Sequence, residues 1–375
     1  ATMMPASLAL VRITFTNVRE RNMAIAVWMS VAVVGAATGP VLGGLLLEFF
    51  WWGSVFLINV PIALATLLAV VAIAPPNIPN PHKQWDLVSS IWAMFAMLGM
   101  VTAIKELANP NRAAWLLIAA TVVGLIGLLL FIFRQRVLEQ PLLDAQIFRS
   151  RIFTGGVVTA AVMMFVVAGL ELMTTQRFQT AGGFTPLQAG ALVATVAVPS
   201  IPAALLGGAF LHRVGFIPLI SGGFAVLSLG IGLAWWTFRF DSLVPFIASL
   251  LLVGIGSGFA SSVASTAILG AAPLDKAGMA SSVESVSYEF GTLISVAVLG
   301  SLLPLFYALG APGAVAGDVD HGVEHPVHGA AAIAAYDDAY LLILLILTAV
   351  AALAAVVTAY CFRGNPKEAG VDAPQ

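Results

Sequence analysis

The sequence predicts an all-α integral membrane protein that crosses the bilayer many times. Charged residues make up 9% of the 375 residues, hydrophobic residues make up 60%, and the mean hydropathy is +1.00. Soluble domains carry roughly a quarter charged residues, and so little polar surface cannot cover a water-soluble domain of this size. Uncharged runs of about 20 residues, the length of a helix that crosses the hydrocarbon core, recur along the chain.

Ten such runs are long enough to cross a bilayer completely. We expect spans at residues 23–48, 54–74, 86–108, 112–134, 152–178, 186–210, 216–238, 242–270, 277–308 and 338–362. Residues 1–11 are apolar but too short to cross, so we expect them to be the end of a helix whose beginning precedes this chain.

The distribution of Lys and Arg predicts which side of the membrane is cytoplasmic. If the ten spans alternate in direction, twelve of the 16 basic residues fall on one side, and Lys105, Arg112, Arg177 and Arg239 fall on the other. Basic residues favour the cytoplasmic side, so the richer side, which also carries the C-terminus, is cytoplasmic. Arg177 lies close to the outer end of its span, where we expect it to reach toward the interface.

Two connections between the spans are long. Residues 135–151 are basic with a Pro in the middle, and we expect them to link two helix bundles. Residues 309–337 are rich in Gly, Ala and Pro and contain three His but no Lys or Arg. Histidines at such spacing can converge on a metal ion, but the Gly and Pro among them and the lack of a helical pattern predict a mobile, solvated loop without a metal site.

The first span carries a ridge of glycines. Gly35, Gly39 and Gly43 recur every four residues, so they share one helix face and let another backbone approach closely. Pro40 removes a backbone donor and bends this ridge, and Gly44 completes a terminal Gly-Gly pair. Small residues at this spacing also occur on ordinary packing faces, but the combination with Gly-Pro and Gly-Gly is more specific.

This pattern resembles the antiporter signature in the fifth helix of drug/proton antiporters of the major facilitator superfamily. Later segments are similar to the branch of that family with fourteen helices, the QacA, SmvA and LfrA type of multidrug efflux pump. They are Trp52 with residues 55–61 (VFLINVP), residues 141–144 (PLLD), residues 183–190 (GFTPLQAG) and residues 276–280 (KAGMA). Their order and spacing agree over nearly the whole chain.

The resemblance implies that the ten spans are helices 5 to 14 of a major facilitator transporter and that the chain is N-terminally incomplete. Residues 1–74 would hold the end of helix 4 with helices 5 and 6, residues 75–134 would form two extra helices, and residues 135–151 the cytoplasmic linker. Residues 152–362 would form a six-helix C-terminal bundle, followed by a cytoplasmic tail at 363–375. Such bundles transport by alternating access.

Three acidic residues, Glu171, Glu284 and Glu289, stand more than one turn inside the ends of the expected spans. An ionised side chain near the bilayer centre costs roughly 3 kcal/mol on insertion scales, so it needs a partner, a water-filled cavity or a bound proton. A carboxyl group out of water favours its neutral form, and a proton and a cation exclude each other at one acid. The three are therefore candidates for proton coupling and cation binding, although an acid near a helix end can instead reach for the interface.

The three acids differ in position. Glu171 lies nearer the outer face, with Thr174 and Thr175 on the next turn as hydrogen-bond candidates. Glu284 is closer to the cytoplasmic side and Glu289 is deeper, and five residues separate them by about 140° around a helix, so they are expected to face different ways. Proteins that resemble this chain carry acids around all three places.

Aromatic and Met side chains offer ring faces and polarisable sulfur to flat lipophilic cations. The candidates for such a pocket are Met164, Phe165, Met173 and Tyr288. Tyr288 is the strongest, because it lies one turn from Glu284 and beside Glu289. Ordinary packing or lipid contact is the simpler interpretation of each of the others.

Several kinds of function find no support in the sequence. It has no nucleophile motif, phosphate-binding Gly loop or Cys cluster, which disfavours an enzyme and ATP-driven transport. The single Cys361 can form no internal disulfide, and a net charge of −2 gives no electrostatic case for nucleic-acid binding.

The resemblance implies a proton-coupled multidrug efflux antiporter of the bacterial inner membrane, monomeric, without a cofactor and driven by the proton gradient. Its partners would be lipophilic cationic drugs (quaternary ammonium compounds, dyes and fluoroquinolones), protons and the lipid bilayer. Two alternatives stay open. One is a major facilitator transporter of a metabolite or lipid, and the other is a non-transporting membrane sensor or interaction protein on the same scaffold.

Overall fold

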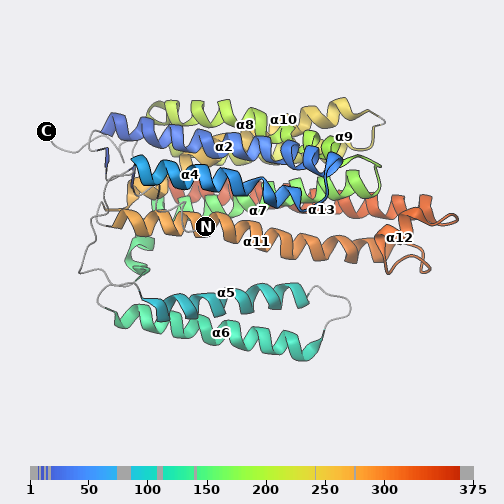
Figure 1. Cartoon of the computed structure of the whole chain (residues 1–375), viewed down its shortest axis with the longest axis horizontal. Helices are drawn as coiled ribbons and strands as arrows, with labels where there is room; N and C mark the ends of the chain where they lie inside the picture. Colours follow the sequence, from blue (N-terminus) through green and yellow to red (C-terminus); the bar gives the residue numbers. More distant parts are fainter. Residues whose placement is uncertain are drawn as a thin grey trace.

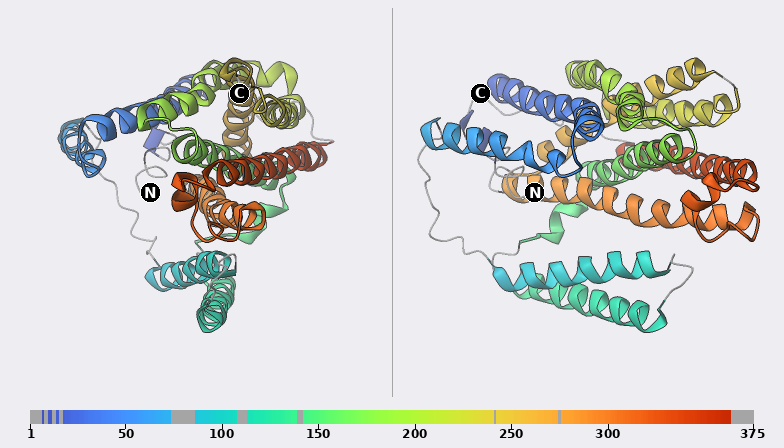
Figure 2. Two further views of the ribbon diagram at one scale, coloured as in Figure 1. Left: turned by 90° about the vertical axis from the view of Figure 1, so that its right-hand side faces the viewer. Right: turned by 45° about the vertical axis from the view of Figure 1, so that its right-hand side comes forward.

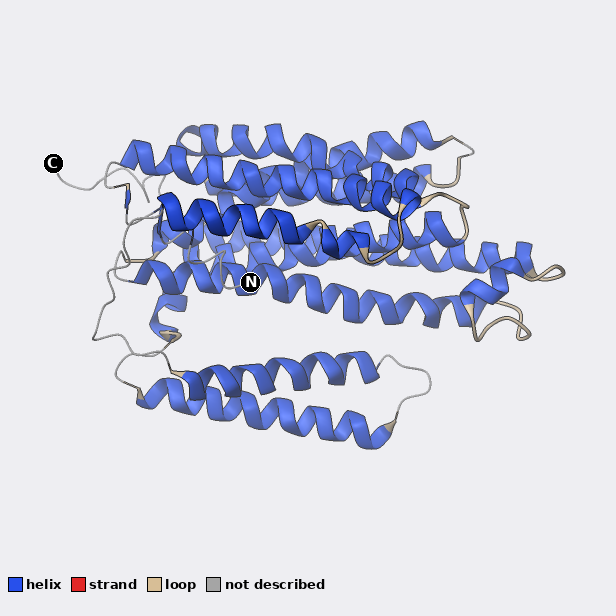
Figure 3. Ribbon diagram, viewed as in Figure 1, coloured by secondary structure: helices blue, strands red, loops and turns tan. Residues whose placement is uncertain are grey.

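Every regular element among the described residues is a helix (Figure 3). The computed structural model describes residues 18–73, 86–107, 113–138, 142–240, 242–273 and 276–363, with a few positions before residue 18. The expected helix end at residues 1–11 therefore lies largely outside the described residues. The helices are α2 (Val18–Phe49), α3 (Ser54–Leu57), α4 (Asn59–Ile73), α5 (Leu87–Leu107), α6 (Ala114–Val137), η1 (Ala145–Arg149), α7 (Arg151–Thr180), α8 (Pro186–Val214), α9 (Phe216–Thr237), α10 (Leu243–Ala271), α11 (Ala277–Gly310), α12 (Val319–Glu324) and α13 (Gly329–Phe362).

The helices confirm the predicted membrane spans. Within the described residues, nine helical stretches are long and apolar enough to cross a membrane, and the 32-residue α2 covers the first expected span. α3 and α4 together form the second span, which is interrupted at Ile58 because Pro61 has no backbone N–H to donate. The predicted start of the sixth span is confirmed at Pro186, where Thr185 caps α8 in a capping box.

Helices α7 to α13 form one bundle around a continuous apolar core (Figure 1). α10 packs against α8 and α9, α13 packs against α9 and α7, and α11 packs against α7. Glycines let the backbones approach closely: a Cβ added at Gly256 of α10 would stand 2.5 Å from the backbone N of Leu227 in α9. Aromatic rings fill the core where α9, α10 and α13 meet, and there Phe238 lies against Phe246 and Tyr340.

α7 and α11 run parallel in a defined register. The Ser295 hydroxyl of α11 donates to the carbonyl oxygen of Phe165 in α7 over 2.7 Å, an offset of 130 residues. Gly291, four residues earlier, lies directly against Ala161, at the same offset. A residue of α11 therefore lies at the same height in the bundle as the residue of α7 whose number is 130 lower.

The α5–α6 pair stands beside the bundle rather than within it (Figures 1 and 2). Its two helices pack through glycines, and a Cβ added at Gly124 would stand 3.0 Å from the backbone N of Met100. At the end of the pair nearest the linker, Arg134 forms two hydrogen bonds with Asp86, of 2.8 and 2.9 Å. In the described residues, α11 is the bundle helix against which α5 packs.

The outer loop is more ordered than the sequence predicts, and the expectation of a solvated loop without helix is wrong for most of it. α13 begins at Gly329, nine residues before the expected span, because the Ala-rich run that follows favours helix. α12 forms where Asp318 accepts hydrogen bonds from two backbone N–H groups. The Tyr307 hydroxyl donates to the carbonyl of Val315 over 3.1 Å, and Val315 is buried.

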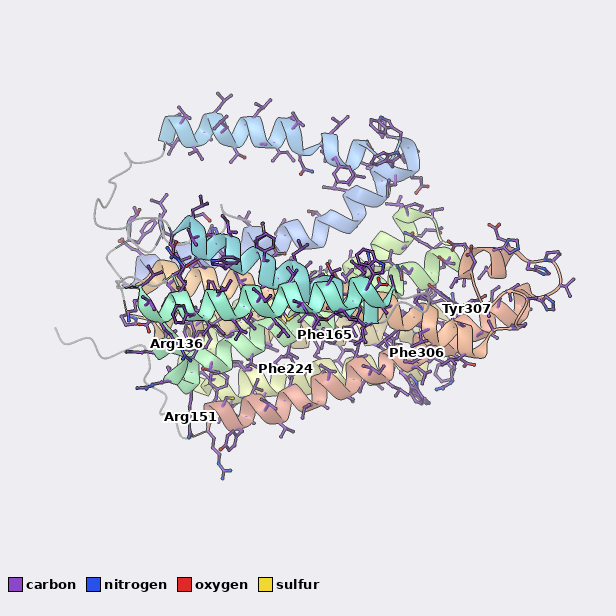
Figure 4. All side chains as sticks on the ribbon, turned by 90° about the horizontal axis from the view of Figure 1, so that it is seen from below. Arg136, Arg151, Phe165, Phe224, Phe306 and Tyr307 are labelled. Carbon is purple, nitrogen blue, oxygen red and sulfur yellow. The ribbon has the colours of Figure 1, made fainter. Side chains whose placement is uncertain are left out.

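If the spans alternate in direction, the basic linker and the outer loop must lie at opposite ends of the bundle. Figure 4 shows Arg136 and Arg151 at one end and Tyr307 toward the other. The basic linker and the 311–328 loop therefore lie at opposite ends of the helices.

Candidate functional site

Glu284 is the acid that the bundle buries. It lies two turns into α11, and 4% of its surface is exposed. Its Oε2 atom and the hydroxyls of Ser265 and Ser281 are buried and have no hydrogen-bond partner among the described atoms. Ser281 precedes Glu284 by three residues and so shares its helix face, while Ser265 comes from α10.

An unpaired polar group is costly to bury, and an unpaired charge costs far more. The described residues supply no partner that would offset a charge on the Oε2 atom of Glu284. Ser265 and Ser281 are residues that the sequence reasoning missed, since Ser is common in membrane helices and only the packing of α10 against α11 selects these two.

In contrast to the buried Glu284, Glu289 lies on an exposed surface of α11. It is exposed, and it shares an exposed stripe of α11 with Ser282, Val286, Leu293 and Val296. The different burial of Glu284 and Glu289 agrees with the angle predicted from their spacing. A lone acid facing lipid would cost roughly 3 kcal/mol, so this stripe is suited to a water-filled cavity or another part of the protein.

Glu171 is half-buried on α7 and makes no hydrogen bond to any described residue. The offset of 130 residues places Glu284 level with residue 154 of α7, so Glu171 lies about 25 Å farther along the helix axis at 1.5 Å per residue. Thr174, an expected partner, instead hydrogen-bonds to the hydroxyl of Tyr340 over 2.9 Å. The structure therefore does not bring Glu171 and Glu284 into one site.

The expectation that Arg177 reaches toward the interface is wrong. Its guanidinium forms an ion pair with Asp337 and lies 5.1 Å from the ring centroid of Phe238. The reason is the early start of α13, which carries Asp337 alongside α7. A cavity of about 520 Å³ opens beside this pair and is lined partly by Asp338 and Arg239, at the end of the bundle away from Glu284.

The proposed pocket side chains separate into two groups. Tyr288, Met164 and Phe165 are half-buried, and Met164 lies against Gly291 of α11. Figure 4 shows Phe165 in the middle of the bundle. Met173 is fully buried in the apolar core, so it packs the bundle and lines no open surface.

Of the motif glycines in α2, Gly44 is the one that meets α8 among the described atoms. A Cβ added at Gly44 would stand 2.6 Å from the carbonyl oxygen of Pro186, whereas one added at Gly35, Gly39 or Gly43 meets no described atom within 4 Å. One turn beyond Gly44, Glu48 accepts a hydrogen bond of 3.2 Å from the Thr185 hydroxyl. The side chain of Pro40 lies outside the described residues.

A second contact that sequence reasoning missed joins two of the motifs quoted above. Lys276 forms an ion pair of 2.5 Å with Asp144. The hydrogen bond from Lys276 holds the pKa of the Asp144 carboxyl below its ordinary value, and the hydrogen bond from Arg134 does the same for Asp86. Both motifs were visible as family segments, but nothing in either indicates that they pair.

One histidine of the outer loop, His325, hydrogen-bonds to the backbone of that loop. The His325 Nδ1 atom accepts hydrogen bonds of 3.2 Å from the backbone N–H groups of Val327 and His328. Among the described His, Cys, Asp and Glu residues, no group of three is placed to hold a metal ion.

Comparison with known proteins points to a family of transporters. Residues 1–295 match the sequence profile described as Major Facilitator Superfamily. The chain is 34% identical over 304 residues to the methyl viologen resistance protein SmvA of Salmonella typhimurium, which covers 81% of this chain and 61% of that protein. It is 32% identical over 339 residues to the multidrug efflux pump LfrA of Mycolicibacterium smegmatis, covering 89% and 67% respectively.

A more distant relative is the multidrug resistance protein Stp of Mycobacterium tuberculosis, 30% identical over 79% of this chain and 55% of that protein. The chain thus spans 61% of the length of SmvA. A crystal structure of a bacterial homolog of the human lysosomal transporter Spinster, inward-facing and unoccupied, overlaps 96% of this chain and 90% of that one. Its TM-score is 0.46 at 16% identity, and we infer nothing from it.

Proposed function

Because the chain belongs to the major facilitator superfamily, we propose that the protein is a proton-coupled multidrug efflux antiporter. It is a multi-pass membrane transporter rather than an enzyme. In this proposal it works as a monomer in the bacterial inner membrane with its C-terminus in the cytoplasm. It needs no cofactor, because the proton gradient drives it. Its substrates are lipophilic cations such as quaternary ammonium compounds, dyes and fluoroquinolones.

The observation that carries the proposal is the pair of acids on α11. Glu284 is buried without a partner for its Oε2 atom, and Glu289 stands alone on an exposed apolar stripe of the same helix. Acids in such places mark ion and substrate pathways in membrane proteins. The names of the relatives, which are drug and methyl viologen resistance proteins, support a cationic or drug-like cargo.

Exchange follows from simple electrostatics. When Glu284 or Glu289 holds a proton it is neutral and attracts no cation, and when it binds a cation it cannot keep the proton. A proton entering from outside therefore displaces the cation, and the membrane voltage adds about 2.3 kcal/mol per charge per 100 mV. Tyr288, Met164 and Phe165 provide faces for a flat cation, and Gly44 with Glu48 brings α2 against α8 at the outer end.

Glu171 has a separate place in this proposal. It lies about 25 Å from the level of Glu284 by the helical rise, toward the outer end of α7. At that depth it is suited to proton entry rather than to cation release into the same cavity.

Ethidium efflux from energised cells expressing the full-length coding sequence tests the proposal. The parent is compared with Glu284→Gln, Glu289→Gln and Glu171→Gln at equal surface amounts, with and without a protonophore. Glu324→Gln is the matched control, because Glu324 is exposed on α12 outside the spans. We expect the protonophore to abolish efflux and Glu284→Gln to lower it at least about tenfold. Efflux that survives the protonophore and all three changes would refute proton coupling through these acids.

A further inference from the structure

The cytoplasmic linker and the start of α11 are joined by one aspartate. The Oδ2 atom of Asp144 accepts a hydrogen bond from the Lys276 ammonium over 2.5 Å, and its Oδ1 atom accepts one from the backbone N–H of Gln146 over 2.9 Å. Its own backbone N–H points at the sulfur of Met279, 3.2 Å away. Asp144 therefore caps η1 and at the same time contacts both Lys276 and Met279 of the next element.

An apolar cluster supports this polar contact. Ile147 of η1, Phe153 of α7 and Ala280 of α11 are buried together with residues at the end of α10, and Met279 packs against them. Since protein interiors are close-packed and resist rearrangement, the linker is part of the same rigid layer as the α10–α11 turn. A contact built on such a layer is suited to holding, not to opening and closing.

The start of α11 depends on this contact. Lys276 is the residue before the helix, and its side chain makes no capping hydrogen bond to the first turn. The first turn of a helix leaves unpaired N–H groups and frays unless it is capped or held. The ion pair and Met279 hold that turn, and Glu284 lies two turns above it.

The same layer reaches the α5–α6 pair. The backbone N–H of Leu143, next to Asp144, donates to the side chain of Gln135 over 3.1 Å. Gln135 in turn donates to the Ser89 hydroxyl over 2.8 Å, and Ser89 donates to Asp86. A continuous hydrogen-bonded route therefore runs from the base of the pair to the start of α11.

We propose that Asp144 and Lys276 form a permanent strap that positions α11, and with it Glu284, and that carries the α5–α6 pair along with the C-terminal bundle. The proposal rests on the proposed function, because Glu284 is the acid whose place is set. Asp144 and Lys276 are positioning residues: they touch neither the proton nor the cargo. If the start of α11 is no longer held in place, the Glu284 carboxyl shifts relative to Ser265 on α10, and exchange slows.

Ethidium efflux kinetics in a Cys361→Ala background, which removes the single Cys of these 375 residues, test the strap. We expect Lys276→Met and Asp144→Asn to lower the maximal rate roughly three- to tenfold, and Lys276→Arg to retain the parent rate. Glu324→Gln is the control, because Glu324 is an exposed acid on α12 outside this layer; it should stay within about twofold.

A covalent crosslink in place of the ion pair distinguishes a permanent contact from one that opens and closes during transport. In the double variant Asp144→Cys with Lys276→Cys, we expect a slow maximal rate that returns toward the parent rate after treatment with a short bis-maleimide crosslinker. Crosslinked protein that is arrested would overturn the proposal, because the contact would then be a gate. Neutral variants that export at the parent rate would overturn it as well.

Two further outcomes distinguish a failure of the strap from a failure of the proposed function. If Lys276→Met does not reach the membrane, the crosslinked double variant and Lys276→Arg decide the question by the same criteria. If the parent itself exports no ethidium while crosslinking at positions 144 and 276 is efficient, the proposed function fails and the geometry of the strap stands.

Discussion

The C-terminal bundle and the α5–α6 pair hold helices together in different ways. In the most apolar window of α5 and of α6, 17% of residues are buried, against 44% in α7 and 50% in α10. The bundle encloses large side chains such as Phe224, Phe246 and Tyr340. The pair has no such core: its described buried residues are small, and its ion pair lies at one end.

This difference shows what each part needs from the membrane. The bundle excludes lipid from a core of its own, so its stability comes from side-chain packing. The pair leaves most of both helices to lipid and relies on close glycine contact, which gains dispersion energy where helix backbones touch. A change at a glycine is therefore felt in both regions, whereas loss of a large side chain is felt only in the bundle.

The largest effect is expected from Gly291→Val in the bundle. A Cβ at this position collides with the Ala161 backbone of α7, so α11 cannot dock. We expect at least about a tenfold loss of folded, monodisperse protein in detergent, measured by fluorescence-detected size exclusion. Gly300→Val is the control on the same helix, since a Cβ there meets no described atom. Equal yields of the two variants would contradict the register of α7 and α11.

A smaller effect is expected when a Met side chain is truncated. Met173→Ala opens a hole in the core and should lower the free energy of unfolding by about 2 to 5 kcal/mol, because Met173 is fully buried. Met94→Ala on α5, where Met94 is 56% exposed, should change it by less than about 0.5 kcal/mol. Equilibrium unfolding in mixed micelles measures both. Similar losses would mean that the pair is packed as tightly as the bundle.

Gly124→Val tests whether the α5–α6 pair can be disrupted without unfolding the bundle. The added side chain pushes α6 away from Met100 and Gly99 of α5, which should cost about 1 to 3 kcal/mol while the bundle stays folded. Hydrogen exchange should then rise in α5 and α6 and stay unchanged in α7 to α13. Leu129→Val, at an exposed position of α6, is the control. Loss of the whole fold would show that pair and bundle form one cooperative unit.

The smallest effect concerns pH. The pKa of Asp144 and of Asp86 is held below the ordinary value of 3.8 by Lys276 and Arg134. A lowered carboxyl pKa stabilises the fold above the ordinary value, and this contribution is lost as pH falls through the lower, folded value. Both ion pairs should therefore stay intact from about pH 5 to about pH 8.

Thermal unfolding of the parent, Asp144→Asn and Asp86→Asn checks this expectation. The difference between parent and variant should be the same at both ends of that pH range. A difference that shrinks on acidification above about pH 5 would show that these carboxyl groups titrate near their ordinary value.

Much of the fold could be predicted because a chain in lipid must satisfy its backbone hydrogen bonds internally. Apolar runs of the right length must be helices, and the start at Pro186 was visible from the Thr and Pro of its cap. The start of α13 was not, because the Gly, Ala and Pro content of residues 309–337 indicated a loop that ends at Asp337. Asp337 pairs with Arg177, 160 residues away, and such a partner leaves no trace in the local sequence.

The candidate site was predictable in its residue types and less so in its geometry. Helical spacing alone separates Glu284 from Glu289, and the structure agrees. Which of them is buried depends on α10, since Ser265 belongs to another helix. Similarly, the regular spacing of Gly35, Gly39 and Gly43 indicates a shared face, but only the neighbouring helix decides that Gly44 makes the close contact.

The isolation of the α5–α6 pair also bears on how such a chain can change over generations. No residue of α5 or α6 belongs to either apolar core cluster of the described structure. A segment that shares no core with its host can be inserted or deleted with little penalty to folding. The stretch that carries α5 and α6 is thus a tolerant site in the gene, where a helix hairpin can be gained, exchanged or lost while the bundle of α7 to α13 is inherited intact.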